Sequence, residues 1–304
     1  MGEGFTGSRV GALQKAHRVE TVYYVAIERR RSMSITLRFK SLIYAITASS
    51  DASNAVKRLG LLERRLPSAA SRFAIPFVFR GRGYFRSMRP RQNPGEIERL
   101  YQAVCELRPR RVLEIGTAKG GTLYLWTQAA ADDAAIVSLD LPGGPFGGGY
   151  PAQRVPFYQA FARPGQNLAL MRADSHAEAS LAAVRAHFGA GPVDFAFIDG
   201  DHTYEGVRQD VAMYSPLVRE GGIVAFHDIL PQEWSPVTQV HRVWNELKRD
   251  NEVEEFIDRD APRQIGIGLI RVPRDGLRLA TGAHSDETRA SRDASSVPAA
   301  ASIE

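Results

Sequence analysis

Short apolar runs and amphipathic stretches alternate along the chain from residue 94 onward. The apolar runs are rich in Val, Ile, Leu and Phe, and most end at Gly or Asp, which is typical of buried strands. Between them, apolar residues recur at intervals of three and four, which predicts helices. The clearest helix covers 204–218, where Val207, Val211 and Tyr214 share one face. The predicted strands lie at 110–116, 135–140, 168–174, 193–199, 222–228 and 264–272.

Strands that alternate with helices form parallel sheets, because each helix returns the chain to the edge where the previous strand began. We therefore predict an α/β domain over residues 94–272, with a parallel sheet and helices on both faces. Its first helix would begin near Pro94, since Ile97, Leu100 and Val104 follow at helical spacing.

Charge divides the chain into further parts. Residues 1–93 hold 18 Lys/Arg against 5 Asp/Glu, whereas the remaining residues hold 21 against 29. We expect residues 1–50 to form a basic, poorly ordered arm and residues 51–93 to form a helical or loop extension. Residues 273–304 are rich in Ala, Ser, Arg and Asp, so we expect a disordered tail after the domain at 94–272.

The basic arm could bind several kinds of partner, because its positive charge attracts phosphates, nucleic acid and anionic lipid. Residues 22–48 alternate apolar and basic groups, which permits weak contact with a membrane surface, although "ERRR" interrupts the pattern. No run of about 18 apolar residues predicts a membrane span, and the start lacks the order of a secretory signal. Met33 is a second candidate for the start of the chain.

The single cysteine, Cys105, excludes an internal disulfide and a zinc–cysteine cluster. It lies on an apolar helix face, where we expect a buried, inert thiol. One cysteine in 304 residues favours a reducing compartment, and we expect the protein in the cytoplasm. His176, His187, His241 and His284 follow no ligand spacing, and we interpret them as surface or packing residues.

Acidic residues gather where the predicted strands end. Ligands of open α/β sheets bind beyond the carboxyl ends of the strands, so these positions are candidates for chemistry. One acid there can be an ordinary helix cap, but caps alone do not explain an acid at four of the first five strand ends. These acids are Asp140, Asp174, Asp199 and Asp228, with Glu114 inside the first strand.

Residues 113–122, "LEIGTAKGGT", predict a tight turn from the first strand into a helix. Gly116 and Gly120 would let the backbone turn sharply and let a ligand approach closely. The spacing differs from the Gly-x-Gly-x-x-Gly of dinucleotide sites, because Ala118 occupies the middle position. A helix start that only needs a tight turn is the alternative interpretation.

The next two strand ends suit a nucleoside. Asp140 ends the second strand, where a carboxylate can accept hydrogen bonds from both ribose hydroxyls. Asp174 and Ser175 end the third strand and could meet an adenine edge. The alternatives are a turn aspartate at Asp140 and a cap of the helix near His176 at Asp174.

Together, "LEIGTAKGG", Asp140, Asp174 and "FIDGDH" resemble class I S-adenosylmethionine-dependent methyltransferases. The nearest resemblance is to metal-dependent small-molecule O-methyltransferases, including the macrolide and glycolipid sugar O-methyltransferases and cephalosporin-hydroxylase-like proteins. It covers about residues 94–272 and implies a Rossmann-like fold with a seven-stranded, mostly parallel sheet and helices on both faces. The cofactor-binding residues that it implies are Glu114, Gly116, Thr117, Ala118, Gly120, Asp140, Asp174, Ser175 and Asp199.

The resemblance also implies a divalent metal, Mg²⁺ or Mn²⁺. In those families the acid that ends strand four binds the metal, and a pair that ends strand five completes the protein ligands. Asp199 matches the first position, and His227 and Asp228 match the pair. The usual pairs are Asp-Asn or Glu-Asp, so the histidine is a departure. An imidazole ligand would shift preference from Mg²⁺ towards Mn²⁺, Fe²⁺ or Zn²⁺, unless His227 turns away and water fills the gap.

His202 takes the position of the catalytic lysine of those families, and we predict that it is the general base, with Asp199 as the second catalytic residue. The alternative is that His202 only caps the helix at 204–218. The segment 142–150 holds five glycines and lies where a lid would lie, with a flexible connector as the alternative. Trp234 could line the pocket of the methyl acceptor.

We therefore expect an enzyme that methylates a hydroxyl of a small molecule, a sugar or a glycosylated natural product, with help from a divalent metal. A NAD-dependent oxidoreductase is disfavoured by the glycine spacing. A nucleic-acid methyltransferase is encouraged by the basic arm, but the chain has no Asn-Pro-Pro-Tyr-like motif for base flipping. A non-catalytic cofactor-binding protein is the third alternative, and a homo-oligomer stays open.

Overall fold

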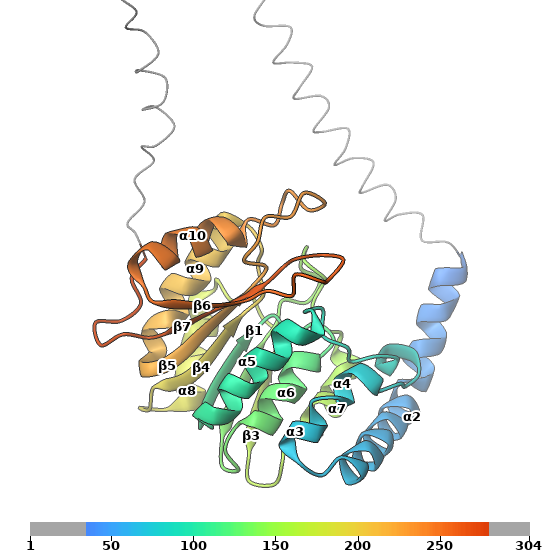
Figure 1. Ribbon diagram of the computed structural model, residues 1–304. Coiled ribbons are helices and arrows are strands. Elements are labelled where there is room, and N and C mark those ends of the chain that lie inside the picture. The colour runs from blue at the N-terminus through green and yellow to red at the C-terminus, as the bar shows by residue number, and fades with distance from the viewer. Residues whose placement is uncertain (1–34, 280–304) are drawn as a thin grey trace, which may run out of the picture.

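A seven-stranded sheet runs through the centre of the computed structural model, which describes residues 35–279 and the side chains of residues 47–279 (Figure 1). The strand order is β3-β2-β1-β4-β5-β7-β6. The first five strands pair in parallel, and β7 runs antiparallel between β5 and β6. The predicted fold class is thereby confirmed. The strands are β1 Arg111–Ile115, β2 Ala135–Leu139, β3 Asn167–Met171, β4 Val193–Ile198, β5 Val218–His227, β6 Val253–Phe256 and β7 Ile267–Arg271.

Register in the middle of the sheet aligns the strand ends. Ile115, the last residue of β1, lies opposite Leu139 of β2 and Ile198 of β4. These strands are almost wholly buried, since helices cover both faces. The residues that follow the aligned ends, from three different parts of the sequence, therefore meet along one edge of the sheet.

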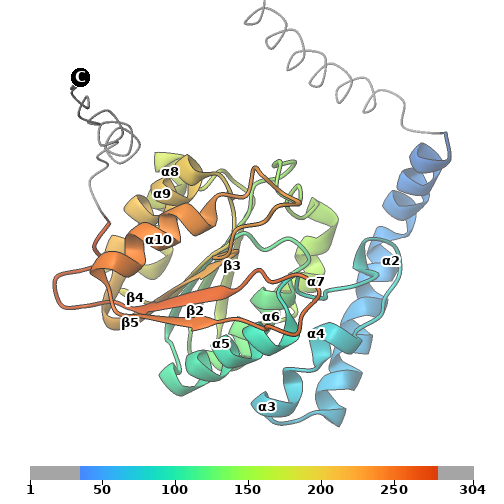
Figure 2. The ribbon, with the colours of Figure 1, turned by 45° about the horizontal axis from the view of Figure 1, so that its top comes forward.

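The helices divide into two layers (Figures 1 and 2). α5, α6 and α7, together with α2, α3 and α4, lie on one face of the sheet, and α8, α9 and α10 lie on the other. The α-helices are α2 Ile35–Arg65, α3 Ala69–Arg72, α4 Ile75–Val78, α5 Pro94–Leu107, α6 Gly121–Ala129, α7 Val155–Gln159, α8 Glu178–Phe188, α9 Tyr204–Tyr214 and α10 Val240–Asp250. Three single 3₁₀ turns are η1 Gly83–Phe85, η2 Ala152–Arg154 and η3 Ser215–Leu217.

The long helix α2 crosses the boundary that the sequence analysis places between residues 50 and 51. It lies beside α4 and α7 (Figure 2), and Ala52, Ala55 and Leu59 are buried in the core on that face. These three residues follow at intervals of three and four, which gives the helix one apolar stripe. Residues 35–50 therefore belong to the same helix as residues 51–65. The rest of the predicted arm, with Met33, lies outside the described residues.

Two features near the C-terminus differ from the predictions. β6 was missed because two glutamates stand between Val253 and Phe256, so the strand shows no apolar run. Residues 273–279 were assigned to the tail, but Arg278 N–H donates to Asn251 Oδ1 at 3.1 Å and Asn251 Nδ2 donates back to Arg278 O at 2.8 Å. The remainder of the predicted tail lies outside the described residues. Within residues 35–279, no helix is long and apolar enough to cross a membrane.

Candidate active site

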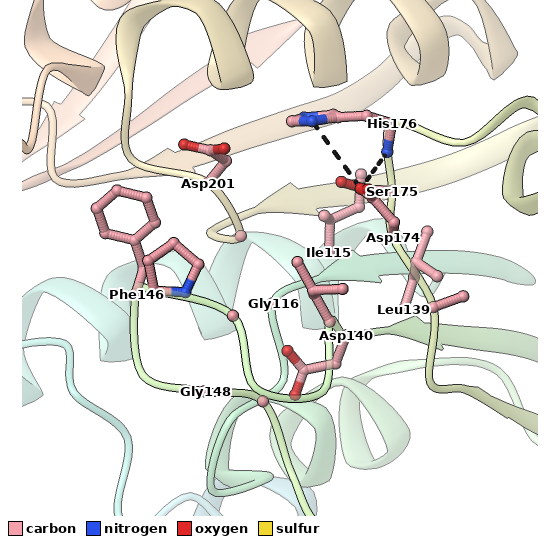
Figure 3. A pocket seen from close by; sticks show the side chains of 16 residues that line it. Ile115, Gly116, Leu139, Asp140, Phe146, Gly148, Asp174, Ser175, His176 and Asp201 are labelled. Carbon is pink, nitrogen blue, oxygen red and sulfur yellow. Dashed lines mark hydrogen bonds and ion pairs between the residues drawn. The ribbon is translucent and has the colours of Figure 1, made fainter. Parts of the chain in front are cut away.

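Two adjoining cavities open at the edge of the sheet where the parallel strands end. The first, of about 180 Å³, is lined by the ends of β1, β2 and β3 and by the glycine-rich segment 142–150 (Figure 3). The second, of about 450 Å³, lies against the ends of β4 and β5. Residues that line both are Gly116, Asp140, Phe146, Gly149 and Gly200. The shared lining lets two ligands meet at the junction.

The turn after β1 is closely packed at two glycines. Gly116 has a φ of +90°, and a Cβ there would lie 2.0 Å from the carbonyl oxygen of Asp199, so only glycine lets the ends of β1 and β4 approach this closely. Gly120 has a φ of +78°, and its Cβ would lie 2.6 Å from the Tyr158 ring. Of the turn's backbone, Gly116 lines both cavities and Ala118 lines the second.

Glu114 and Thr117 support this turn from inside the protein. Glu114 is fully buried and accepts hydrogen bonds from Thr117 Oγ1 at 2.7 Å and Trp126 Nε1 at 3.0 Å. Burial raises the pKa of Glu114 to about 8. Thr117 Oγ1 also lies 2.6 Å from Ser138 Oγ. Neither side chain lines a cavity, so the cofactor contacts predicted for them stay predictions.

Asp140 lies at the junction of the two cavities. Its Oδ2 accepts hydrogen bonds from the backbone N–H groups of Ala118 at 3.0 Å and Tyr150 at 3.1 Å. Burial raises the pKa of Asp140 to about 6, although these bonds act in the opposite direction. Asp140 thus links the turn after β1 to the end of the glycine-rich segment and faces the first cavity (Figure 3). This is the position at which the sequence predicts the ribose contact.

Asp174 and Ser175 also line the first cavity. Asp174 Oδ1 accepts a hydrogen bond from the His176 N–H at 2.9 Å, which satisfies the backbone before α8. Tyr214 Oη donates to the carbonyl oxygen of Ser175 at 2.6 Å. Both predicted residues are therefore in place beside the cavity, with Asp174 about half exposed.

His176 is more than the surface or packing residue that the sequence predicts. It lines the first cavity, and its Nε2 lies 3.3 Å from Oδ1 of the fully buried Asp210 of α9. This contact raises the pKa of His176 to about 9. Nε2 of His176 also lies 3.1 Å from the carbonyl oxygen of Gly206. Burial raises the pKa of Asp210 as well, and we assign the proton to the imidazole because that ring is partly open to solvent. The pairing was missed because it joins residues 34 positions apart.

Four side chains predicted as metal ligands or catalytic groups meet at the ends of β4 and β5. His227 Nδ1 lies 3.0 Å from Asp199 Oδ1 and 3.4 Å from Asp228 Oδ1. His202 bridges the same acids, with Nε2 3.4 Å from Asp199 Oδ1 and Nδ1 3.1 Å from Asp228 Oδ2. Asp199, His202 and Asp228 each offer a ligand atom within 4.8 Å of the others. All four residues line the second cavity.

The acids and imidazoles of this cluster shift one another's pKa values. Burial alone would raise the pKa of Asp199, but His227 and His202 hold it below its usual value. Burial alone would lower the pKa of His227, but Asp228 and Asp199 raise it to about 9. Asp199 and Asp228 likewise raise the pKa of His202 against the effect of burial. Both acids thus favour positive charge in the space between them.

The cluster fits a divalent cation. A cation between Asp199 and Asp228 would replace the positive charge that the protonated rings otherwise supply. Two carboxylates with an imidazole suit Mn²⁺, Fe²⁺ or Zn²⁺ better than Mg²⁺, which prefers oxygen donors. The second nitrogen of His227, Nε2, is buried without a hydrogen-bond partner among the described residues.

Two glutamines, neither of them predicted, hold the acids in position. Gln92 Nε2 donates to Asp199 Oδ2 at 2.7 Å, and Gln232 Nε2 donates to Asp228 Oδ1 at 2.7 Å. Asp228 itself has a φ of +62°, a left-handed conformation that is uncommon for a residue with a side chain. Gln92 precedes α5, in the part of the chain assigned to the extension, and no spacing in the sequence points to its role.

The cap alternative for His202 is wrong. The N-cap of α9 is Thr203, whose Oγ1 accepts a hydrogen bond from the Gly206 N–H at 3.0 Å. The His202 ring instead stacks on Phe146 of the glycine-rich segment, with centroids 4.9 Å apart and planes inclined by 16°. The segment predicted as a lid therefore lies over the junction of the cavities. Trp234, predicted to line an acceptor pocket, lines the second cavity and is 48% exposed.

Residues 113–229 match a family described as "Methyltransferase domain". The match includes the ends of the strands from β1 to β5. Among curated proteins, the chain is similar to the uncharacterized protein R132 of Acanthamoeba polyphaga mimivirus, with 36% identity over 64 residues. That similarity covers 21% of this chain and spans 28% of the length of the curated protein.

Solved structures of O-methyltransferases are similar to the chain at low sequence identity. TomG from Streptomyces achromogenes, in complex with S-adenosylmethionine, is 16% identical with a TM-score of 0.46, over 67% of this chain and 89% of that chain. An O-methyltransferase from Bacillus cereus is 14% identical with a TM-score of 0.44, over 67% and 97% of the two chains. At TM-scores below 0.5, these similarities do not bear on the substrate of this chain.

Proposed function

We propose that the protein is an S-adenosylmethionine-dependent O-methyltransferase that acts on a small molecule with a divalent cation, and the match of residues 113–229 to a family described as "Methyltransferase domain" supports this proposal. The observation that carries this proposal is the junction of the two cavities. Asp140 and the glycine turn lie on one side of it, and the Asp199–Asp228 cluster lies on the other. A methyl donor in the first cavity would meet an acceptor hydroxyl in the second.

The first cavity suits S-adenosylmethionine. Asp140 would accept hydrogen bonds from the ribose hydroxyls, and the backbone at Gly116 would let the cofactor approach closely, since glycine has no side chain there. The adenine would lie towards Asp174, Ser175 and His176, which line the part of the cavity that follows β3 (Figure 3). A charged His176 at this wall would donate a hydrogen bond to an adenine nitrogen.

Asp199, His227 and Asp228 hold the metal in this proposal, and His202 is the base. A bound divalent cation lowers the pKa of a coordinated hydroxyl. His202 faces the second cavity and is 17% exposed, so an acceptor can reach it, whereas His227 is only 5% exposed. Gln92 and Gln232 orient the acids by the hydrogen bonds described above.

S-adenosylmethionine would supply the methyl group: as the acceptor oxygen bonds to the methyl carbon, the carbon–sulfur bond would break and its electron pair would stay on sulfur. The hydroxyl proton passes to a ring nitrogen of His202. Phe146, stacked on that ring, limits its movement.

The acceptor class remains a sugar or glycosylated natural product, as the sequence resemblance implies. The exposed face of Trp234 supports this class, because an aromatic ring packs against the apolar face of a sugar ring. A cytoplasmic location also remains part of the proposal.

Methyl transfer to a panel of hydroxylated sugars and glycosides, followed by mass spectrometry, tests the function. We expect turnover that excess EDTA abolishes, with the affinity for S-adenosylhomocysteine largely kept in calorimetry. Binding of NAD in place of S-adenosylhomocysteine would favour an oxidoreductase. Cofactor binding without turnover on any acceptor would favour a non-catalytic protein, and full activity in EDTA would remove the metal from the mechanism.

A further inference from the structure

Two exposed arginines, here called the basic rim, line the second cavity together with the acids Asp199 and Asp228. Arg91 lies in the segment between η1 and α5, and Arg263 lies between β6 and β7. Both residues line the cavity together with Asn93 and Trp234. The methyl-transfer chemistry proposed above makes no use of either arginine.

The two segments that carry this rim are joined although 170 residues separate them. Asn93 Nδ2 donates a hydrogen bond to the backbone carbonyl oxygen of Arg263 at 2.9 Å and a second one to Glu96 Oε1 at 3.1 Å. Glu96 Oε1 also accepts from the Asp258 N–H at 3.0 Å. These bonds fix the backbone of both arginines relative to α5, so the rim is a built feature of the cavity.

Neither arginine has a carboxylate partner. Within residues 47–279, no Asp or Glu oxygen lies within 4.0 Å of a guanidinium nitrogen of Arg91 or Arg263, whereas Arg219 pairs with Asp194 at 2.6 Å. The guanidinium of Arg263 lies over the Trp234 ring, 5.6 Å from its centroid. Such a contact leaves the edge of the guanidinium, with its N–H donors, free to bind an anion.

The acids that line the cavity already accept hydrogen bonds from groups other than the arginines. Asp140 accepts backbone hydrogen bonds, Asp199 accepts from Gln92, and Asp228 accepts from Gln232. The arginines are therefore not there to neutralise them. Two planar donors without a carboxylate partner, both lining the same cavity, match a carboxylate or a phosphate, each of which accepts bidentate hydrogen bonds from guanidinium groups.

We propose that the methyl acceptor carries an anionic group, a carboxylate or a phosphate, which Arg91 and Arg263 bind while Trp234 covers its ring. The proposal rests on the function proposed above and specifies its substrate class. The α-carboxylate of the cofactor offers the same chemistry, so the experiment must separate an acidic acceptor from the cofactor.

Isothermal titration in EDTA, at constant ionic strength and with and without S-adenosylhomocysteine, tests the rim with three probes. Glucose is neutral, glucuronate carries a carboxylate, and glucose 6-phosphate carries a phosphate. The proteins are the wild type, Arg91→Gln, Arg263→Gln and the double variant, with Arg185→Gln on the exposed face of α8 as the matched control. Circular dichroism confirms that each variant is folded.

We expect the wild type to bind at least one anionic sugar on the order of tenfold more tightly than glucose, the usual strength of a charge-assisted hydrogen bond. The preference should fall below about threefold in the double variant and persist in Arg185→Gln. Equal affinities in the wild type, or a preference that survives in the double variant, would overturn the proposal. So would a similar loss of S-adenosylhomocysteine affinity, which would assign the arginines to the cofactor. Wild-type protein that fails to bind S-adenosylhomocysteine would count against the methyltransferase function alone, since the sugar titrations are also run without it.

Discussion

Asp140 is the single residue whose position bears most directly on cofactor binding. Its carboxylate lies at the junction of the cavities, with Oδ2 held by two backbone N–H groups. Asp140→Asn keeps an oxygen for those groups but removes the charged acceptor of the ribose hydroxyls. We expect S-adenosylhomocysteine to bind ~1–3 kcal/mol more weakly in calorimetry. Asp133→Asn, on the exposed surface, is the control, and unchanged affinity in Asp140→Asn would place the ribose elsewhere.

Two variants distinguish the roles of the two histidines of the cluster. His202→Ala should keep the metal, measured by mass spectrometry after dialysis, and lower kcat by ~10²–10⁴, because a positioned base is lost. Activity should recover in part at high pH, where the acceptor ionises without help. His227→Ala should instead lose metal. Loss of metal from His202→Ala would make His202 the third ligand, as its contacts with Asp199 and Asp228 also allow.

Whether the sequence predicts the role of a single residue depends on its position in the fold. Asp140, Asp199 and Asp228 could be found because parallel strand ends share one edge of the sheet. Gln92 and Asp210 could not, because each acts through a contact with a residue far away in the sequence, Gln92 with Asp199 and Asp210 with His176. A lone glutamine or a helix aspartate carries no pattern that reports such a partner.

At the scale of elements, Gly116 is the joint between β1 and β4. Gly116→Ala would place a Cβ 2.0 Å from the Asp199 carbonyl oxygen at a φ of +90°, so strain and overlap add together. We expect a loss of about 3 kcal/mol or more in the free energy of unfolding, measured with urea. Gly276→Ala is the matched control, since its φ is +81° but nothing lies within 4 Å, and it should cost only ~1 kcal/mol. Equal losses would mean that the strand ends can separate without cost.

The His176–Asp210 pair ties the loop after β3 to α9 and makes stability depend on pH. The pKa of His176 is raised to about 9, so its stabilisation is complete below about pH 6.5 and is lost as the pH rises through 9. The double variant His176→Gln, Asp210→Asn removes both charges and serves as the reference. Relative to it, the free energy of unfolding of the wild type should fall by on the order of 2 kcal/mol as the pH rises from 6.5 to 9. Urea unfolding at pH 6 and pH 9 measures it, and parallel pH profiles of the two proteins would contradict the pairing.

Helices and strands with a clear pattern of apolar residues could be predicted from the sequence, and the other elements could not. β1 and β4 are short apolar runs, and α9 shows Val207 and Val211 on one face, so their sequences suffice. β6 forms a strand because it pairs with the free edge of β7, and its own residues show no strand pattern. The stacking of Phe146 on His202 depends on the path of a glycine-rich segment, which no propensity determines.

At the scale of the whole molecule, the N-terminal extension belongs to the active site through a chain of contacts. α2 packs on η1, and Arg58 Nη1 donates to the carbonyl oxygen of Arg80 at 2.6 Å. The segment after η1 leads to Gln92, which holds Asp199, and to Arg91 on the cavity rim. An extension that the sequence places outside the domain therefore positions a group at the reacting centre.

Truncation tests this coupling. A chain that starts at Met33 keeps the whole of α2, so we expect its S-adenosylhomocysteine affinity and turnover to stay within about twofold of the wild type. A chain that starts at Pro67 loses the buried side chains of Ala52, Ala55 and Leu59, a loss of several kcal/mol in the free energy of unfolding.

If the shorter chain folds, its turnover should fall further than its cofactor affinity. All residues that line the first cavity come later in the sequence than Val112, in the domain itself. Gln92 and Arg91, at the second cavity, lie in the segment that α2 holds in place through Arg58 and Arg80. Parallel calorimetry and methyl-transfer assays, with thermal unfolding to confirm the folded state, measure the two losses. Equal losses in affinity and turnover would show that α2 supports the domain as a whole. A folded chain from Met33 that fails to bind the cofactor would place a binding element in residues 1–32, ahead of every residue assigned above.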